Sequence, residues 1–151
     1  MRLWHYELIE FLPRSQLIAQ WRELNSIYTK QDKHILIDYV YEYDRVHLLA
    51  YSLMVISEMN KRGYRINSTK NFDEFFKYTR LVAISSLPTF RPFPEHHTKR
   101  YLIQCFYNLQ EKYDRGQKDF SRELYEKLKA YMDEHARKGN TNAIRTQRKR
   151  I

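Results

Sequence analysis

Glycine, cysteine and long apolar runs are scarce in this chain of 151 residues, which contains three glycines, four prolines and one cysteine. A single cysteine excludes an intrachain disulfide, which favours a reducing compartment. No apolar run approaches the ~20 residues that a membrane-spanning helix needs. Glu7 and Glu10 interrupt any secretory signal pattern near the start. We therefore expect a cytoplasmic protein with no membrane partner.

Motifs for metal binding and for several kinds of catalysis are also missing. His96 and His97 are adjacent, so they point apart, and there is no His-Glu-x-x-His motif or cysteine cluster. There is no Gly-x-Ser-x-Gly elbow, and three isolated glycines cannot build a phosphate-binding loop. The apolar spacing around Cys105 makes it a core residue rather than a nucleophile. We predict neither a metal site nor a cofactor.

Apolar side chains and positive charge are abundant. Apolar residues make up 42% of the chain and aromatic residues 15%, with thirteen tyrosines. A single domain of this length buries roughly 70% of the surface of its unfolded chain, enough for a real core. The formal net charge is +9, and the four basic residues within 139–151 account for four of these charges. A basic body of +5 favours polyanionic partners, most often nucleic acid.

The scarcity and placement of glycine predict an all-α, compact, single-domain helical bundle. Gly63, Gly116 and Gly139 each follow basic residues, as is typical of the C-terminal ends of helices. The first helix is expected to begin near Pro13, and its apolar stripe contains Leu17, Ile18, Trp21, Leu24 and Tyr28.

Capping residues predict where the remaining helices begin. Asp44 is expected to start a helix that reaches residue 62, with a buried stripe of Val46, Leu49, Leu53 and Ile56. Residues 34–43, just before it, favour a short helix and a turn. Asn71 opens a short helix with capping-box character, and Thr98 and Ser121 cap two long helices. The stripe of the first of these contains Leu102, Cys105 and Leu109, and that of the second contains Leu124, Leu128 and Tyr131 or Met132.

Two segments are not expected to be helical. Residues 85–97 contain three of the four prolines, at positions 88, 92 and 94, which predicts a long loop. Residues 139–151 are polar and unpatterned, which predicts a disordered basic tail. We therefore divide the chain into a helical domain of residues 1–138 and a flexible tail of residues 139–151.

The chain terminus and Glu23 are the best candidates for chemistry. An α-amino group titrates near pH 7.7–8.0, well below a lysine side chain, so part of it is neutral and nucleophilic at cellular pH. Glu23 falls away from the apolar stripe of the first helix, and small residues share its side of the helix. Such a carboxylate leaves room for a ligand to approach. These small residues are Ser15, Ala19 and Ser26.

Several segments together resemble the pyrimidine dimer DNA glycosylase family, whose best-known members are the phage and algal-virus endonuclease V type enzymes. The distinctive parts are Met1-Arg2-Leu3-Trp4 and the Trp-Arg-Glu at positions 21–23. Tyr-Asp-Arg at 43–45, Lys-Arg-Gly-Tyr at 61–64 and the segment 94–115 are weaker matches. Together these segments cover most of residues 1–115.

The resemblance implies a fold in which the N-terminal segment is threaded between helices. It also implies cleavage of the glycosidic bond at a cyclobutane pyrimidine dimer, followed by nicking of the abasic strand. The α-amine of Met1 would be the nucleophile and Glu23 the essential carboxylate. Arg2 and Arg22 would bind the DNA beside them. We expect double-stranded DNA with damaged bases as the partner, a monomeric enzyme, and further phosphate contacts from Lys33, His34, Lys99 and Arg100.

The chain departs from the family pattern in three ways. Arg2 is bulky, so we expect Met1 to be retained rather than removed. Asn25 and Ser26 stand where the viral enzymes carry an arginine shortly after the glutamate, and a basic tail replaces their aromatic C-terminal segment. Two alternatives therefore stay open: a non-catalytic DNA-binding module of the same fold, and a lyase that acts only on abasic DNA or on another damaged base.

Overall fold

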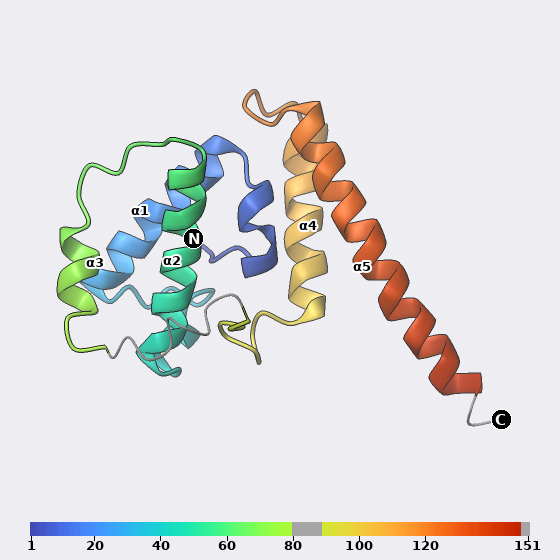
Figure 1. Cartoon of the computed structure of the whole chain (residues 1–151), viewed down its shortest axis with the longest axis horizontal. Helices are drawn as coiled ribbons and strands as arrows, with labels where there is room; N and C mark the ends of the chain where they lie inside the picture. Colours follow the sequence, from blue (N-terminus) through green and yellow to red (C-terminus); the bar gives the residue numbers. More distant parts are fainter. Residues whose placement is uncertain (80–88, 149–151) are drawn as a thin grey trace.

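The structure is a computed structural model that describes the backbone of residues 1–79 and 89–148 and the side chains among these up to residue 135. Every regular element in the described part of the chain is a helix, so the predicted all-α fold is confirmed (Figure 1). The elements are η1 (Tyr6–Phe11), α1 (Arg14–Lys30), η2 (Asp38–Tyr41), α2 (Arg45–Lys61), α3 (Lys70–Phe75), α4 (Lys99–Asp114) and α5 (Arg122–Arg148).

Helix α1 begins directly after Pro13, as predicted. Leu17, Trp21 and Leu24 are buried, which confirms the central part of the apolar stripe. The buried face also includes Gln20, a polar residue that is only 1% exposed. Because burying a polar side chain is unfavourable unless it is hydrogen-bonded, this glutamine indicates an internal polar network beside the core.

Helix α2 has the predicted ends but a different buried face. The Asp44 carboxylate accepts a hydrogen bond of 3.0 Å from the backbone N–H of Val46. Gly63, at φ +74°, ends the helix in a Schellman motif, with Tyr64 N–H donating to the Met59 carbonyl at 2.9 Å. The residues 34–43 before α2 form the expected turn and short helix, η2.

The predicted stripe of α2 is largely wrong, because only Leu49 among its four residues is buried. Val46, Leu53 and Ile56 are half-buried. Helix α2 packs against α1, η1 and η2, so it is covered from several directions rather than along one stripe (Figure 1). Its buried residues are Leu48, Leu49, Ala50, Tyr51, Ser52, Val55 and Met59.

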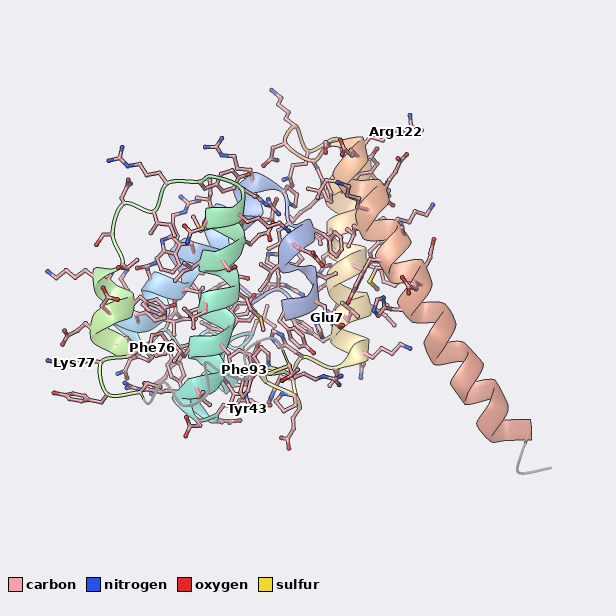
Figure 2. All side chains as sticks on the ribbon, in the orientation of Figure 1. Glu7, Tyr43, Phe76, Lys77, Phe93 and Arg122 are labelled. Carbon is pink, nitrogen blue, oxygen red and sulfur yellow. The ribbon has the colours of Figure 1, made fainter. Side chains whose placement is uncertain are left out.

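Helix α3 begins two residues earlier than a cap at Asn71 predicts. It starts at Lys70 and its N-cap is Thr69, whose hydroxyl donates to the Asp73 carboxylate at 3.0 Å. An aromatic cluster lies between α3 and α1, since the Phe75 and Phe76 rings both lie 5.4 Å from the Tyr28 ring of α1. Figure 2 shows Phe76 inside the helical body and Lys77 at its edge. The cluster holds α3 against α1.

Helices α4 and α5 are capped as predicted. The hydroxyls of Thr98 and Ser121 accept hydrogen bonds from backbone N–H groups at 3.3 and 3.1 Å. Gly116, at φ +81°, ends α4 in a second Schellman motif. The predicted buried positions Leu102, Cys105, Leu109, Leu128 and Met132 are all confirmed.

Gly139 does not end the last helix, so that prediction is wrong. Helix α5 continues to Arg148 and projects beyond the rest of the molecule (Figure 1). A glycine inside a helix costs only about 1 kcal/mol relative to alanine, which a helix of 27 residues can accommodate. The expected disordered tail is therefore a helix as far as Arg148. The division into a domain of residues 1–138 and a tail stays a prediction.

The proline-rich loop can be followed only from residue 89, because residues 80–88, with Pro88, lie outside the described residues. Phe93 is fully buried and adopts φ +56°. The left-handed conformation costs a non-glycine residue roughly 1–2 kcal/mol, and burial of the ring offsets it. The Phe93 ring lies 5.4 Å from that of Tyr39 and 5.3 Å from that of His97, inside the body in Figure 2. The loop is thereby anchored in the core.

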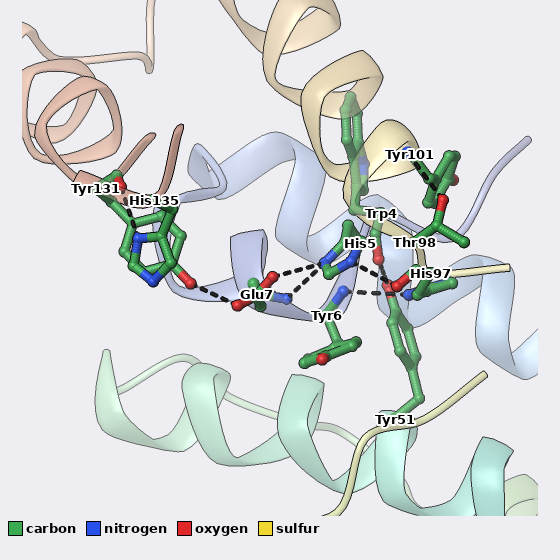
Figure 3. A network of polar contacts seen from close by, with 10 residues as sticks. All are labelled: Trp4, His5, Tyr6, Glu7, Tyr51, His97, Thr98, Tyr101, Tyr131 and His135. Atoms are coloured by element: carbon green, nitrogen blue, oxygen red, sulfur yellow. Dashed lines mark hydrogen bonds and ion pairs between the residues drawn. The ribbon is translucent and has the colours of Figure 1, made fainter. Parts of the chain in front are cut away.

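The N-terminal segment is threaded through the interior, as the resemblance implies. Leu3, Trp4 and His5 are buried. The Tyr101 hydroxyl of α4 donates to the Leu3 carbonyl, and the Tyr51 hydroxyl of α2 donates to the Trp4 carbonyl at 2.6 Å. The segment lies between these two helices and η1 follows it directly (Figure 3).

Two buried histidines connect this segment to the proline-rich loop (Figure 3). The N–H of Glu7 donates to His5 Nδ1 at 3.1 Å, and the N–H of Tyr6 donates to His97 Nδ1 at 3.3 Å. Each Nδ1 is an acceptor, so each neutral ring carries its proton on Nε2. His5 Nε2 then donates to the His97 carbonyl at 2.9 Å, and His97 Nε2 donates to the Tyr39 hydroxyl at 2.8 Å.

This network predicts a loss of stability in acid. Burial lowers the pKa of His97 to about 2 and also lowers the pKa of His5. Below pH 6.5 the unfolded chain protonates His97 while the folded protein keeps that ring neutral, so His97 lowers the free energy of unfolding by about 1.4 kcal/mol per pH unit. The lowered pKa of His5 acts in the same direction. His97→Gln is expected to reduce the pH dependence of the free energy of unfolding by about 1.4 kcal/mol per pH unit. Urea titrations between pH 7 and 4 measure it.

The matched control is His34→Gln, because His34 is exposed. It is expected to leave this pH dependence as in the wild type. A His97→Gln protein whose free energy of unfolding keeps the wild-type pH dependence would show that the proton is taken up elsewhere.

Candidate active site

A cavity of about 480 Å³ opens between the N-terminal segment, α1 and the C-terminal half of α4. Each of the three elements contributes polar side chains to its wall. The lining residues of α1 and of α4 are spaced three and four residues apart, which places them on one face of each helix. The lining residues are Met1, Arg2, Trp4, Gln16, Ala19, Gln20, Glu23, Asn108, Glu111, Lys112 and Arg115.

Met1 and Glu23 both line this cavity. Met1 is 39% exposed and Glu23 is half-buried. Burial raises the pKa of Glu23, while the positive charges of the N-terminal amine and Arg22 and a hydrogen bond from Gln20 act against this rise. The described residues include no ion pair between the amine and the carboxylate, so more than 4.0 Å separates these two groups. They are close enough to interact electrostatically and leave space between them.

Gln20 holds both sides of this arrangement through one side-chain amide. Its Nε2 donates to Glu23 Oε2 at 3.0 Å and to the Arg2 carbonyl at 3.2 Å. Its Oε1 accepts from Trp4 N–H at 2.8 Å and lies 2.9 Å from the Tyr51 hydroxyl, whose one proton is shared between this oxygen and the Trp4 carbonyl. Both donors and both acceptor sites are used. Gln20 therefore fixes the carboxylate and the N-terminal backbone relative to each other.

Arg2 lines the cavity, and its positive charge also affects the thiol of Cys105 on α4. Burial raises the pKa of the Cys105 thiol, and hydrogen bonds and the Arg2 charge only partly offset this. Cys105 is fully buried, so the prediction that it belongs to the core is confirmed. The thiol stays protonated at neutral pH, since burial disfavours the thiolate.

The other predicted DNA-binding residues lie outside this cavity. Arg22 is exposed on α1 beside Glu23 and lines a different cavity. Lys33 and His34 are exposed in the connection between α1 and η2. Lys99 and Arg100 are exposed at the N-terminal end of α4, whereas the cavity lies at its C-terminal half. The fold brings Met1, Arg2 and Glu23 together and leaves the other five residues outside this cavity.

Sequence reasoning missed Gln20 and the whole contribution of α4. Asn108, Glu111, Lys112 and Arg115 follow the spacing i, i+3, i+4, i+7, which is that of one helix face. That spacing was a detectable signal of a shared polar face. Arg115 and Glu111 form an exposed ion pair of 3.1 Å at the rim. Lys112 is a second amine in the cavity and thus a rival to Met1 as nucleophile.

The described part of the chain contains neither a metal-binding group of side chains nor a membrane-spanning helix. Among the described residues, no group of three or more His, Cys, Asp or Glu side chains is arranged to hold a metal ion. None of the described helices is both long and apolar enough to span a bilayer. The polar cavity beside the chain terminus is thus the principal candidate for chemistry.

Two walls of this cavity, the N-terminal segment and α1, belong to a part of the chain that matches a known family. Residues 1–72 match the model of the pyrimidine dimer DNA glycosylase family. The match confirms the resemblance to these DNA repair glycosylases over η1, α1 and α2. It covers Met1, Arg2, Glu23 and Gln20, whereas α4 lies beyond it. No curated protein and no solved structure gives a significant match to the chain.

Proposed function

We propose that this protein is a DNA glycosylase and abasic-site lyase that acts on pyrimidine dimers through the α-amine of Met1 and the carboxylate of Glu23. The observation that carries the proposal is the cavity that the chain terminus and Glu23 line together, where the charge of the amine acts on the carboxylate. The match of residues 1–72 to a glycosylase family supports the reaction class and the dimer substrate.

The amine begins the reaction by attacking C1′ of the damaged nucleotide. A C–N bond forms at C1′, the glycosidic bond breaks, and the pyrimidine leaves with the bonding electrons. Loss of a proton from nitrogen and opening of the sugar ring give an imine, as lysine amines form with carbonyl carbons. The imine acidifies C2′, a base removes a C2′ proton, and the 3′ phosphate leaves by β-elimination. The strand is then cut.

Glu23 has two tasks in this sequence. Its negative charge stabilises the positive charge that develops on the sugar, as carboxylates do in glycosidases. It then carries a proton during ring opening and elimination. Burial raises its pKa from the usual value toward neutrality, and a catalytic acid–base group is most effective when its pKa lies near the working pH.

Positive charge around the cavity binds the DNA. Arg2 lies inside the cavity and Arg22 lies on the exposed side of α1, so both are proposed to contact phosphates next to the lesion. Lys33, His34, Lys99 and Arg100 are proposed as further contacts, at the positions described above. A dimer stacks poorly with its neighbours, which lowers the cost of moving a nucleotide out of the duplex. The monomeric state and the cytoplasmic location stay predictions.

Borohydride trapping tests this proposal. Reduction of the imine during reaction should link the protein covalently to duplex DNA that contains a thymine dimer, and also to DNA with an abasic site. An adduct with abasic DNA only would support the lyase alternative and remove dimer cleavage. No adduct with either DNA, from protein whose terminus is shown by mass spectrometry to be unblocked, would leave the non-catalytic DNA-binding module.

Gln20→Met is predicted to weaken catalysis and shift its pH dependence. The hydrogen bond from Gln20 lowers the pKa of Glu23, so its removal should raise that pKa further. Since the reaction needs the ionised carboxylate, the acid limb of the kcat profile should move to higher pH. We also expect kcat to fall by about 10–100-fold, because the terminus and the carboxylate lose their common support.

Gln16→Met is the matched control, since Gln16 lines the same cavity without a hydrogen bond to Glu23. It should leave the acid limb in place. If both variants lower kcat equally and neither moves the limb, Gln20 has only a structural role.

A further inference from the structure

A second cavity, of about 610 Å³, lies on the other flank of α1. It is formed by α1, the end of α2, residues 64–68 and α3. Residues 14, 18, 21, 22 and 25 of α1 face this cavity, whereas residues 16, 19, 20 and 23 face the Met1–Glu23 cavity. At about 100° per residue these two sets lie on opposite sides of the helix. The exposed ridge of α1 separates the two cavities.

Three arginines line the second cavity. Arg14, Arg22 and Arg65 are all exposed, and none of them forms an ion pair with another described residue. None of the described residues that line the cavity is acidic. The charge of Arg22 acts on Glu23, whereas Arg14 and Arg65 bring two positive charges to the same hollow and form no ion pair with a described residue. An anion is the ligand that compensates these two charges.

Aromatic and amide side chains give this hollow a defined shape. The Arg14 guanidinium lies over the Tyr64 ring at 5.1 Å from its centre, which directs it along the cavity wall. Tyr64 is itself fixed by the Schellman motif that ends α2. Asn71 donates to Asn25 Oδ1 at 3.1 Å across the cavity between α3 and α1. Arg14 is thus held on a helix, whereas Arg65 lies in the connection between α2 and α3.

We propose that this second cavity binds a phosphodiester of the DNA backbone, through Arg14 and Arg65, while the reacting nucleotide occupies the Met1–Glu23 cavity. Bound DNA then crosses the exposed ridge of α1, and both flanks of the helix hold it. An α-helix with its side chains is about 10–12 Å wide. A duplex carries one phosphate charge per roughly 1.7 Å of its axis, so phosphates are available on both sides of such a ridge.

The ridge itself fits close contact with a duplex. Its residues are mostly short, with Ser15, Ala19 and Ser26 beside the longer Arg22. Short side chains let the helix approach the DNA surface, and Arg22 stands between the two cavities. The inference rests on the proposed function, because it takes DNA as the partner.

The experiment measures binding to undamaged duplex DNA, which needs no catalysis. Arg14→Gln and Arg65→Gln are combined, and the association constant is measured over a range of salt concentrations. Each lost phosphate contact lowers the slope of log K against log salt by about one. We expect the double variant to lose about two units of slope and to bind about tenfold or more weakly near physiological salt.

The matched control removes two charges from the far side of the molecule. Arg122 and Lys129 are exposed on α5, away from α1 and α3 (Figures 1 and 2). Arg122→Gln combined with Lys129→Gln lowers the net charge equally and should leave the slope close to that of the wild type. Equal slope changes in the two double variants would overturn the proposal, since net charge alone would then explain them.

Two other results would also overturn it. One is an unchanged slope in a folded Arg14→Gln/Arg65→Gln protein. The other concerns inorganic phosphate alone, whose binding is followed by tryptophan fluorescence. If phosphate binds saturably to the wild type and not to the double variant, while both proteins bind DNA equally, the cavity is a site for a small anion. Failure of the proposed function is seen separately, as wild-type protein that binds DNA with the expected slope but gives no borohydride adduct.

Discussion

Glu23→Gln should abolish cleavage of dimer-containing DNA and leave DNA binding largely intact. Glutamine keeps the volume of the side chain, and its carbonyl oxygen can still accept the hydrogen bond from Gln20. What it loses is the negative charge and the ability to carry a proton. Loss of a positioned acid–base group typically costs about 10²–10⁴-fold in rate, and loss of charge stabilisation adds to this.

The measurement is single-turnover cleavage at saturating protein, with the dissociation constant determined on the same DNA. Glu111→Gln is the matched control, because Glu111 lines the same cavity but is paired with Arg115 at its rim. It should retain most of the wild-type rate. If Glu23→Gln reduces binding and cleavage by the same factor, Glu23 supports the cavity rather than the reaction.

Acetylation of the Met1 α-amine should remove both activities and prevent trapping. An acetylated nitrogen is an amide, which has no nucleophilic lone pair and cannot form an imine. The group is small, and Met1 lies at an exposed edge of the cavity, so the fold and DNA binding should persist. The predicted effect is a complete loss of the chemical step. The assays are strand cleavage and borohydride trapping on protein acetylated at the α-amine alone.

Monomethylation of the same nitrogen is the control for steric effects. A secondary amine can still attack C1′ and form an iminium ion, so this protein should keep measurable trapping. Full activity in the acetylated protein would transfer the role of nucleophile to a side chain. Lys112 is the first candidate, since it is the other amine in the cavity.

Local sequence signals predicted most of the helix ends correctly. Asp44, Thr98 and Ser121 cap helices, and Gly63 and Gly116 end them, because these effects depend on a few adjacent residues. The buried face of α2 could not be predicted in this way. It depends on which elements pack around the helix, and α2 is covered by α1, η1 and η2.

The site was predictable only in part, for a similar reason. The pairing of Met1 with Glu23 came from resemblance to a family, and the family match covers both residues. Gln20 was missed because a polar residue on a buried face gives no signal until its hydrogen-bond partners are known. Three of those partners are backbone groups or Tyr51 of α2, all distant in sequence from Gln20. The α4 wall was missed because the docking of α4 is a long-range contact.

Mass spectrometry of the trapped complex tests the central claim most directly. After borohydride reduction on dimer-containing DNA, the protein is digested and the peptide that carries the sugar remnant is sequenced. The account predicts that the remnant is attached to the α-nitrogen of Met1. Attachment to the side chain of Lys112 or of any other lysine would contradict it.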